Sequence, residues 1–567
     1  MRVPFVVLAA IVGLYAAVKE PVKLLHMSMV TRDGVRLTAN IFLPAEHAHV
    51  PTILIRTPYG KGTELIPNYQ AFVDRGYAVV VQDVRGRYES EGTFEQLHHE
   101  PEDGDDTLNW IASQPWSNGK IGMIGGSYLG ITQWKAALRN NPHLKAIFPV
   151  VSGDDDYGDR YYSRGGALKL GHRLEWMAEN LKAPGYQLDF NRFIWHLPLR
   201  TADVAATGRM SEAYQEAMKH PAFDSFWQAI STKEQLDKIR IPVFAVGGWY
   251  DNYVEGDLEA FAALRKSTGL NHLIVGPWPH NMSSKFADAD FGPDSSVPVR
   301  RLQLQWFDQW LTGKDTPVTS SAPIRYFLMG ANKWREAREW PPPETHPLVL
   351  YLDSNGHANT AAGDGQLQRG LSARAAQDAY TYDPRNPVPT RGGAVCCNPR
   401  VFPWGPLDQR TVESRSDVLV YTTRQLRRDL AIAGPVKVVL YVSTSARDTD
   451  FTAKLVDVFP DGRARILTDG MLRLRYRKSI EQSEFLPPGK IQEITIDAGE
   501  TGNVFLAGHQ LRVEVSSSNF PKYDRNPNTG GSIADETRLV AARQRIYHGA
   551  AHASRVELMR LPDAPRD

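Results

Sequence analysis

The stretch KIGMIGGSYLGITQW, residues 120–134, decides the fold of this chain. Its apolar run at residues 121–124 is typical of a buried parallel strand. Gly125 and Gly126 then permit a turn too tight for side chains, with Ser127 at the turn. A helical pattern of apolar residues follows directly. Strand, tight turn with serine and helix form the pattern of a nucleophile elbow, which holds a hydroxyl beside the first free N–H groups of a helix.

The second glycine of this elbow is displaced. The usual pattern is Gly-x-Ser-x-Gly, whereas the glycine after Ser127 comes one place later here, at Gly130. Gly-Gly-Ser also occurs in ordinary loops. Taken alone, the stretch therefore leaves two interpretations of Ser127 open, a nucleophile or a turn residue.

Composition places the chain among folded globular proteins of several domains. Its 567 residues exceed what one hydrophobic core holds, so two to four domains are expected. A net charge of +1 provides no broad field for nucleic acid or an anionic membrane, and we expect no nucleic-acid partner. Cys396 and Cys397 are the only cysteines. Neighbouring residues rarely form a disulfide, so both are expected to be packing residues.

The N-terminus has the charge-then-apolar order of a targeting signal. Arg2 precedes an apolar run over residues 3–18, which ends at Lys19 and Glu20. The run is shorter than a comfortable membrane span. We expect residues 1–20 to be a signal peptide or N-terminal anchor of an exported, periplasmic or secreted protein rather than a cytoplasmic one. Membrane attachment is expected only through this segment. Cleavage stays open, as does a buried N-terminal strand or helix.

Apolar strands alternate with helices through the N-terminal half. Strands are predicted over residues 35–43, 52–55, 77–81, 121–124, 144–151, 242–246, 272–275 and 324–329. This alternation predicts an α/β domain with a parallel sheet covered on both faces, built from residues 21–151 and 241–345. Residues 152–240 interrupt it with helical patterns, from residue 170 and over residues 212–218 and 226–239, and are interpreted as a helical cap.

A proline-rich linker at residues 339–344 is the clearest domain boundary. Beyond it the pattern changes to short alternating strands, as at Val436, Val438 and Leu440, with turns between them. The sequence therefore predicts a β-sandwich or jelly roll over residues 346–567.

Three residues at predicted strand ends suit acyl transfer. A serine nucleophile needs a base to take its proton and a carboxylate to orient that base. Ser127, Asp251 and His280 each follow a predicted strand, in the serine–acid–histidine order of α/β-hydrolases. Singly, Asp251 suits a helix cap and His280 a solvated loop. Together the three residues predict a catalytic triad.

At this point the chain resembles a known family. GGSYLGITQW, GWYDNY and GPWPH, at residues 125–134, 248–253 and 276–280, are similar to motifs of the cocaine esterase-like and Xaa-Pro dipeptidyl-peptidase-like (CocE/NonD) serine hydrolases. IRTPYGKG, QDVRGRYESEG and DTDFTAKLVDVFPDGRA are similar as well. The resemblance covers essentially the whole chain after the leader. It implies an α/β-hydrolase domain with an inserted helical cap and a C-terminal, galactose-binding-like jelly roll. It also accounts for Gly130, because that family reads Gly-x-Ser-Tyr-x-Gly.

The resemblance implies a role for each site residue. Ser127 would be the nucleophile, His280 the base and Asp251 the acid that orients it. The oxyanion hole would combine the Tyr59 hydroxyl with the backbone N–H of Tyr128. The alternative for Tyr59 is a core aromatic. No cofactor is expected.

Substrate choice is less defined by the sequence. Trp134, Trp249 and Tyr253 are candidates for an acyl pocket, with core packing as the alternative. The family's α-amino-acid ester hydrolases carry acids two and three places after the triad aspartate, where this chain has Tyr253 and Val254. We therefore expect a small-molecule acyl ester as substrate, with amides and Xaa-Pro peptides left open. The oligomeric state also stays open.

Other functions remain as alternatives. Asp154-Asp155-Asp156 suits either a cation site at the cap entrance or a solvated loop, and we expect the loop. A metallohydrolase would need denser ligands than His98-His99-Glu100, which lacks His-Glu-x-x-His spacing, so no metal is expected. The third alternative is a non-catalytic protein that binds carbohydrate or a partner on a hydrolase scaffold.

Overall fold

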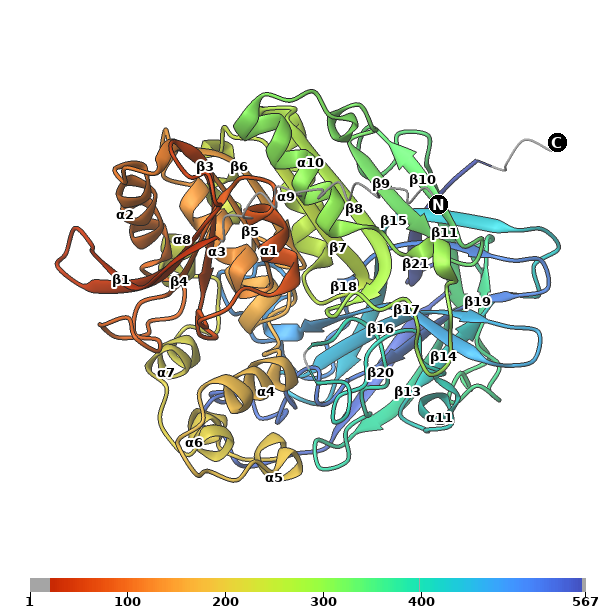
Figure 1. Cartoon of the computed structure of the whole chain (residues 1–567). Helices are drawn as coiled ribbons and strands as arrows, with labels where there is room; N and C mark the ends of the chain where they lie inside the picture. The colour runs from red at the N-terminus through yellow and green to blue at the C-terminus, as the bar shows by residue number, and fades with distance from the viewer. Residues whose placement is uncertain (1–20, 397, 563–567) are drawn as a thin grey trace, which may run out of the picture.

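The N-terminal domain is built on one ten-stranded sheet, ordered β1-β2-β4-β3-β5-β6-β7-β8-β9-β10. A computed structural model describes residues 21–396 and 398–562 (Figure 1). Neighbours from β4 through β3 to β9 run parallel, which confirms the predicted α/β fold. The strands are β1 Val22–Val30, β2 Arg36–Leu43, β3 Val50–Thr57, β4 Ala78–Asp83, β5 Ser117–Gly126, β6 Leu144–Val150, β7 Val243–Tyr250, β8 Asn271–Pro279, β9 Ile324–Leu328 and β10 Lys333–Ala337.

The sequence did not predict the two edge strands, β1 and β10. Both run antiparallel to their neighbours and are the most solvent-exposed strands of the sheet. Strand β10 carries Lys333, Arg335 and Glu336, so it lacks the apolar alternation by which a strand is recognised. Charged side chains on an edge also discourage pairing with another chain.

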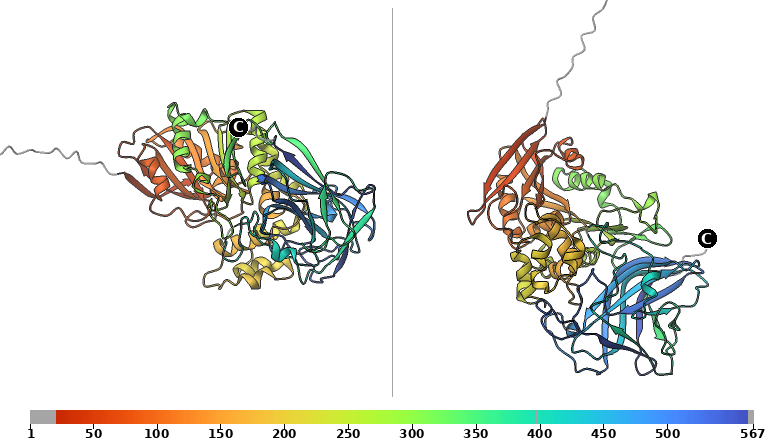
Figure 2. Two further views of the ribbon diagram at one scale, coloured as in Figure 1. Left: turned by 90° about the vertical axis from the view of Figure 1, so that its right-hand side faces the viewer. Right: turned by 90° about the horizontal axis from the view of Figure 1, so that it is seen from below.

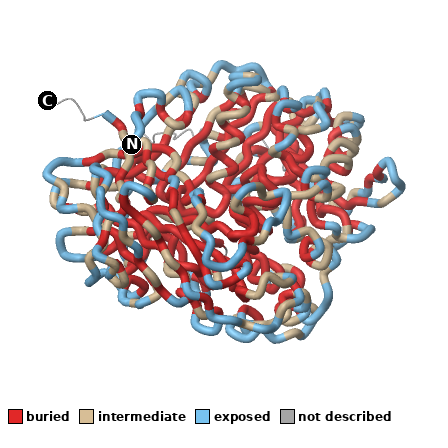
Figure 3. Tube along the Cα trace, turned by 180° about the vertical axis from the view of Figure 1, so that it is seen from behind, coloured by how far each residue is buried: buried red, intermediate tan, exposed pale blue. Residues whose placement is uncertain are grey.

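Helices cover both faces of this sheet. One face packs against α2 Glu100–Ala112, α3 Tyr128–Ala137 and α9 Val254–Ser267, through side chains such as Leu108, Trp134 and Phe261. The other face packs against α1 Pro67–Val73, α10 Val299–Phe307 and the turn η5 Asp308–Thr312, through Phe72 and Trp306. The buried backbone in Figure 3 follows these layers. Two covered faces explain why the parallel strands are apolar runs rather than alternating ones.

Residues between β6 and β7 form the cap, a group of short helices. They are η1 Asp156–Tyr161, α4 Leu170–Asn180, α5 Phe190–Ile194, η2 Leu199–Thr201, α6 Ala202–Thr207, α7 Glu212–Lys219, α8 Ser225–Ile230 and η3 Lys233–Lys238. The prediction of a single helix over residues 226–239 is wrong, because α8 ends at Ile230 and a separate turn, η3, begins at Lys233. The Ile230 carbonyl, at the end of α8, accepts a hydrogen bond from the buried Lys135 ammonium of α3.

The C-terminal domain is all-β, which confirms the predicted change of class. Ten strands follow the order β13-β20-β15-β21-β11-β12-β14-β19-β16-β17, and β18 pairs with β15. Their bounds are β11 His346–Asp353, β12 Gln366–Gln368, β13 Ala376–Tyr382, β14 Leu419–Thr422, β15 Leu430–Thr444, β16 Asp450–Val458, β17 Ala464–Arg473, β18 Gln492–Phe505, β19 Gln510–Ser516, β20 Ala542–His548 and β21 Arg555–Arg560, with one short helix, α11 Arg410–Glu413.

Backbone hydrogen bonds join the three parts. Met329, after β9, exchanges bonds with Gly502 and Val504 of β18 at 3.0 and 2.8 Å. In the cap, the Leu168 N–H donates to Asp524 at 2.7 Å and the Gly171 N–H donates to the Pro521 carbonyl at 2.8 Å. Figure 2 shows the cap helices beside both the N-terminal sheet and the C-terminal domain. Helix α4, which begins one residue before Gly171, is therefore held in place by the C-terminal domain.

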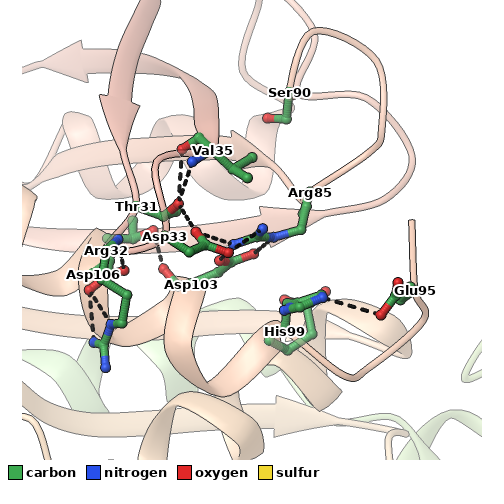
Figure 4. Close-up of polar contacts among 12 residues, drawn as sticks. Thr31, Arg32, Asp33, Val35, Arg85, Ser90, Glu95, His99, Asp103 and Asp106 are labelled. Carbon is green, nitrogen blue, oxygen red and sulfur yellow. Dashed lines mark hydrogen bonds and ion pairs between the residues drawn. The ribbon is translucent and has the colours of Figure 1, made fainter. Parts of the chain in front are cut away.

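The loop that follows β4 is tied down by Arg85. Its guanidinium donates to Asp33, in the turn between β1 and β2, and to Asp103 of α2 (Figure 4). In the same loop, Ser90 Oγ accepts a hydrogen bond from the Thr38 N–H of β2 at 2.9 Å. The segment QDVRGRYESEG is thus an anchored connection beside β2.

Three expectations concern the ends of the chain and its cysteines. The leader, residues 1–20, lies outside the described residues, and so does Cys397. Cys396 is buried and disulfide-bonded, so the expectation that it is an unpaired packing residue is wrong. Within the described residues, no helix combines the length and apolar character needed to cross a membrane.

Candidate active site

Ser127 lies at a strained turn between β5 and α3. Its backbone has φ 56° and ψ −128°, outside the regions that a residue with a side chain prefers. Its N–H donates to the Val150 carbonyl at the end of β6, at 2.9 Å, which holds the turn against the sheet. At Gly125, with φ +140°, an added Cβ would clash with Leu129. The predicted elbow is present, and its geometry raises Ser127 at the carboxyl edge of the sheet.

The structure explains the displaced glycine. A Cβ on Gly130 would lie 2.5 Å from Ser152 Cβ, so α3 can pack this closely on the segment after β6 only without a side chain there. Leu129, where the usual pattern has glycine, is partly buried between two apolar clusters. In this protein the position that must be glycine for α3 to pack closely on the segment after β6 is therefore residue 130.

Asp251 and His280 meet at the ends of two neighbouring parallel strands. Tyr250 of β7 is in register with Pro279 of β8, so the next residue of each strand reaches the same edge. His280 Nδ1 lies 2.6 Å from Asp251 Oδ2. The other Asp251 oxygen accepts the Tyr253 N–H at 2.9 Å. Because the buried carboxylate accepts from Nδ1, the free imidazole nitrogen is Nε2.

Tyr59 brings a hydroxyl to Ser127. It follows β3, and the Ser127 side chain is close enough to its hydroxyl to lower the Tyr59 pKa. The same oxygen accepts a bond from Trp176 Nε1 of helix α4, at 3.1 Å. Burial is the main cause that raises the pKa of Tyr59 above 10.0, so the hydroxyl keeps its proton at neutral pH. Tyr59 is therefore a neutral donor.

Tyr128 contributes its backbone rather than its side chain. As the first residue of α3, it has an N–H without an intrahelical acceptor. Its hydroxyl donates to Glu100 Oε1 at 2.8 Å, and its ring stacks on Trp176 at 6.3 Å between centroids. The side chain thereby anchors the start of α3, and the N–H next to Ser127 stays free of helix bonding.

Of the three predicted pocket aromatics, the structure brings Tyr253 to the site. Its ring lies 5.6 Å from the His280 ring, and its hydroxyl lies 3.4 Å from His172 Nε2. Trp134 is instead in the core, where its N–H donates to Ser152 Oγ at 3.1 Å. Trp249 packs on Trp340, near the C-terminal domain, at 5.5 Å. Strands and helices cover both tryptophans. Their burial agrees with the alternative interpretation of them as core packing residues.

Sequence reasoning missed three side chains of helix α4. His172, Arg173 and Trp176 all lie near Tyr59 or Tyr253, whereas the prediction used only the apolar face of this helix. Burial and the charges of Arg173, Lys169 and His280 hold the pKa of His172 well below its usual range. His172 is therefore neutral beside Tyr253. The sequence offered no motif for these residues, only their place opposite an apolar stripe.

The prediction of a solvated loop at residues 154–156 is wrong, because all three aspartates are buried. Asp155 accepts the N–H groups of Tyr157 and Gly158 at 3.0 and 2.7 Å and so begins the turn η1. Asp156 pairs with Lys135 and with Arg160. Burial raises the pKa of Asp154 well above its usual value. The run thus connects the cap to α3 and the sheet.

Asp159 of η1 predicts a pH dependence of stability. Burial is the main cause that raises its pKa from 3.8 to about 7. The unfolded state loses this proton near pH 4 and the folded state near pH 7, so the folded state binds more protons between those values. Asp159 should therefore lower the free energy of unfolding by on the order of 2–3 kcal/mol from about pH 5 to pH 8. Asp159→Asn should make the slope shallower by that contribution, measured by urea denaturation, while Glu175, Glu500 and Glu514, whose pKa values are also raised, keep the remainder.

Asp535→Asn is the matched control. The ion pair with Arg200 lowers the Asp535 pKa to about 2, so this carboxyl does not titrate in the same window. Its replacement should leave the slope as in the wild type. A slope in Asp159→Asn equal to that of the wild type would contradict the contribution of Asp159.

Residues of the His98-His99-Glu100 run, the densest candidate for a metal site in the sequence, have other partners. Glu100 binds Arg56 and Tyr128, and His99 lies 3.2 Å from Glu95. Over residues 21–396 and 398–562, no group of three or more His, Cys, Asp or Glu side chains is arranged to hold a metal ion.

A covered parallel sheet with a serine at its elbow, and an aspartate–histidine pair at two strand ends, defines a serine hydrolase of the α/β-hydrolase class. Comparison with known proteins specifies the class further. Residues 33–282 match the X-Pro dipeptidyl-peptidase (S15 family), and residues 316–557 match the X-Pro dipeptidyl-peptidase C-terminal non-catalytic domain. The chain is 40% identical over 558 residues to cocaine esterase of Rhodococcus sp. (strain MB1 Bresler), covering 93% of this chain and 96% of that protein. The chain belongs to this S15 family, together with cocaine esterase.

Solved structures agree with the family. An aminopeptidase from a marine sediment archaeon, Thaumarchaeota archaeon, superposes with a TM-score of 0.84 at 27% identity, covering 96% of this chain and 97% of the other. An α-amino acid ester hydrolase superposes with a TM-score of 0.81 at 26% identity, covering 98% of each chain. Because these relatives are hydrolases, they favour an enzyme over the alternative of a non-catalytic binding protein.

Proposed function

We propose that this chain hydrolyses acyl esters through a Ser127–His280–Asp251 triad and an acyl-enzyme. The observation that carries the proposal is the 2.6 Å contact between His280 and Asp251, in a fold whose elbow serine lies beside a neutral tyrosine hydroxyl. Relatives with ester and peptide substrates in their names support the same chemistry.

In the acylation step, Ser127 Oγ attacks the ester carbonyl carbon and its proton passes to His280 Nε2. Asp251 holds the imidazole by Nδ1 and stabilises the imidazolium that forms. The Tyr59 hydroxyl and the Tyr128 N–H donate hydrogen bonds to the carbonyl oxygen and stabilise its negative charge. The ester bond then breaks, and the alcohol leaves with the proton from His280. Water repeats the sequence on the acyl-enzyme, releasing the acid and restoring Ser127.

The surroundings of Tyr253 support a neutral acyl group. Tyr253 stands two places after Asp251, beside His280, and the neutral His172 lies behind its hydroxyl. The guanidinium carbon of Arg160 lies 5.8 Å from the Tyr253 ring centroid. The described residues that contact the Tyr253 ring and hydroxyl therefore provide no carboxylate to pair with a substrate ammonium. Amides and Xaa-Pro peptides remain further candidates within the same acyl-enzyme chemistry.

A fluorophosphonate probe tests this proposal. The probe phosphorylates an activated serine, so we expect stoichiometric labelling at Ser127, read by mass spectrometry, and none in Ser127→Ala. Among matched aryl esters, a neutral acyl group should be cleaved faster than the α-amino acyl group of equal length. A folded protein that the probe leaves unlabelled would contradict the proposal and favour the binding alternative.

The N-terminal segment, residues 1–20, supports a separate proposal that the enzyme is exported. The order of Arg2 and the apolar run over residues 3–18 supports export, with the enzyme secreted, periplasmic or anchored at its N-terminus. Fractionation of cells that make the full chain tests it, and recovery of the enzyme in the cytoplasm alone would contradict it.

A further inference from the structure

Arg173 of helix α4 is a buried cation without a carboxylate partner. Four arginines of the described chain are fully buried, and three of them, Arg56, Arg160 and Arg473, form ion pairs with carboxylates. Arg173 forms none with any described residue. A buried charge that lacks a counterion is strongly unfavourable, so its presence calls for a physical reason.

Neutral groups surround this guanidinium. Nη1 donates to Gln96 Oε1 at 3.3 Å, whereas Nε has no acceptor within the described part of the chain. The guanidinium carbon lies 4.7 Å from the ring centroid of Tyr161 and 4.8 Å from that of Trp176. Aromatic faces hold a cation in position but do not neutralise it. The positive charge of Arg173 is therefore preserved at this place.

A series of contacts leads from Arg173 to the candidate oxyanion hole. Trp176 lies one helical turn after Arg173, and its Nε1 donates to the Tyr59 hydroxyl oxygen at 3.1 Å. The Tyr59 hydroxyl in turn lies beside the Ser127 side chain, which lowers the Tyr59 pKa. The charge of Arg173 acts on Tyr59 directly, because it opposes the rise of the Tyr59 pKa on burial. Arg173, Trp176, Tyr59 and Ser127 thus form a continuous series of contacts from the cap to the elbow.

We propose that Arg173 and Trp176 are positioning residues for the oxyanion hole, which they orient and polarise through Tyr59. A tyrosine hydroxyl has one proton, and the Trp176 N–H occupies an acceptor position on its oxygen. That proton is then directed toward Ser127 and the oxyanion. Arg173 supplies the positive charge that has no counterion in the resting enzyme and finds a negative one nearby only when the oxyanion forms. This inference rests on the proposed role of Tyr59.

Neutralising Arg173 tests the inference. Arg173→Gln keeps a polar side chain and removes the charge, so kcat should fall about 10- to 50-fold with KM nearly constant. Arg173→Lys keeps the charge and should recover part of the loss. Because Arg173→Gln removes an unpaired buried charge, its unfolding midpoint should be at least that of the wild type. A purely structural role would lower the midpoint instead.

Arg525→Gln is the matched control. Arg525 is also buried, binds only carbonyl oxygens within the described residues, and lies over the rings of Trp195 and Phe520. It makes none of the contacts that lead to Tyr59, so its replacement should leave kcat unchanged. An unchanged kcat in Arg173→Gln, or an equal loss in Arg525→Gln, would overturn the inference.

A double-mutant cycle separates this inference from the proposed function. If Arg173 acts through Tyr59, Arg173→Gln should lower kcat much less in a Tyr59→Phe background than in the wild type. Equal losses in both backgrounds would overturn the inference while leaving Tyr59 in the oxyanion hole. An unchanged kcat in Tyr59→Phe alone would instead contradict the role on which the inference rests. Trp176→Phe keeps an aromatic ring but removes the N–H donor together with part of the indole, and it should lower kcat about tenfold. This variant extends the test if Arg173→Gln folds poorly.

Discussion

Alanine at Ser127 or at His280 is expected to lower kcat by about 10³-fold or more while leaving the fold intact. Without Ser127 no acyl-enzyme forms, and without His280 no group takes the serine proton. The double variant should be little worse than either single one, because the two residues act as one unit. Steady-state hydrolysis of an aryl ester measures the loss, and circular dichroism with thermal melting checks the fold.

Ser320→Ala is a suitable control, because it removes an exposed serine of the turn after Pro317. Its kcat should equal that of the wild type. Hydrolysis at nearly the wild-type rate by folded Ser127→Ala would refute the nucleophile assignment. If the losses in Ser127→Ala and His280→Ala multiplied in the double variant, the two residues would not be acting in one step.

Tyr59→Phe is expected to lower kcat by about 10²- to 10³-fold with KM nearly constant. The change keeps the ring and its edge contact with Trp176, whose centroid lies 6.4 Å away, and deletes one hydroxyl. The transition state thereby loses one preorganised donor, whereas ground-state binding loses little. Reaction with the fluorophosphonate probe should slow as well, because its phosphoryl oxygen occupies the same position. Measurements of kcat, KM and melting temperature distinguish this role from packing.

Tyr88→Phe is the matched control for that experiment. Tyr88 is exposed and packs over Gly60, the neighbour of Tyr59, so it is near Tyr59 in the fold but outside the series of contacts to Ser127. Loss of the Tyr88 hydroxyl should leave kcat unchanged. If Tyr59→Phe also left kcat unchanged, the Tyr128 N–H would need a different companion donor.

Several features could be predicted because they depend on local sequence. The apolar run at residues 121–124, the glycines and Ser127 specify a strand, a turn and a helix within one short segment. Asp251 and His280 were predictable because each follows an apolar strand, and parallel strands bring their carboxyl ends to one edge. The change to alternating strands after residue 345 marked the C-terminal domain. In each case the information lies within a few residues of the element.

Other features depended on contacts between distant segments. Asp154 to Asp156 read as a polar run, yet they are buried because Lys135 and Arg160 and the backbone of η1 approach them in the fold. Trp134 and Trp249 stand at motif positions but pack into the interior. The edge strand β10 has no apolar period and is defined by β9, the neighbour with which it pairs.

The sequence by itself determined the class of fold, the elbow and the order of the candidate triad. Only the tertiary structure decided that α4 lies beside Tyr59, that Trp176 donates to its hydroxyl, and that Arg173 is buried with no carboxylate partner among the described residues. The physical reason is that periodicity and turn residues record which face of an element is apolar. Neither signal shows which distant element, more than a hundred residues away in the sequence, packs against the apolar face or contacts the polar face.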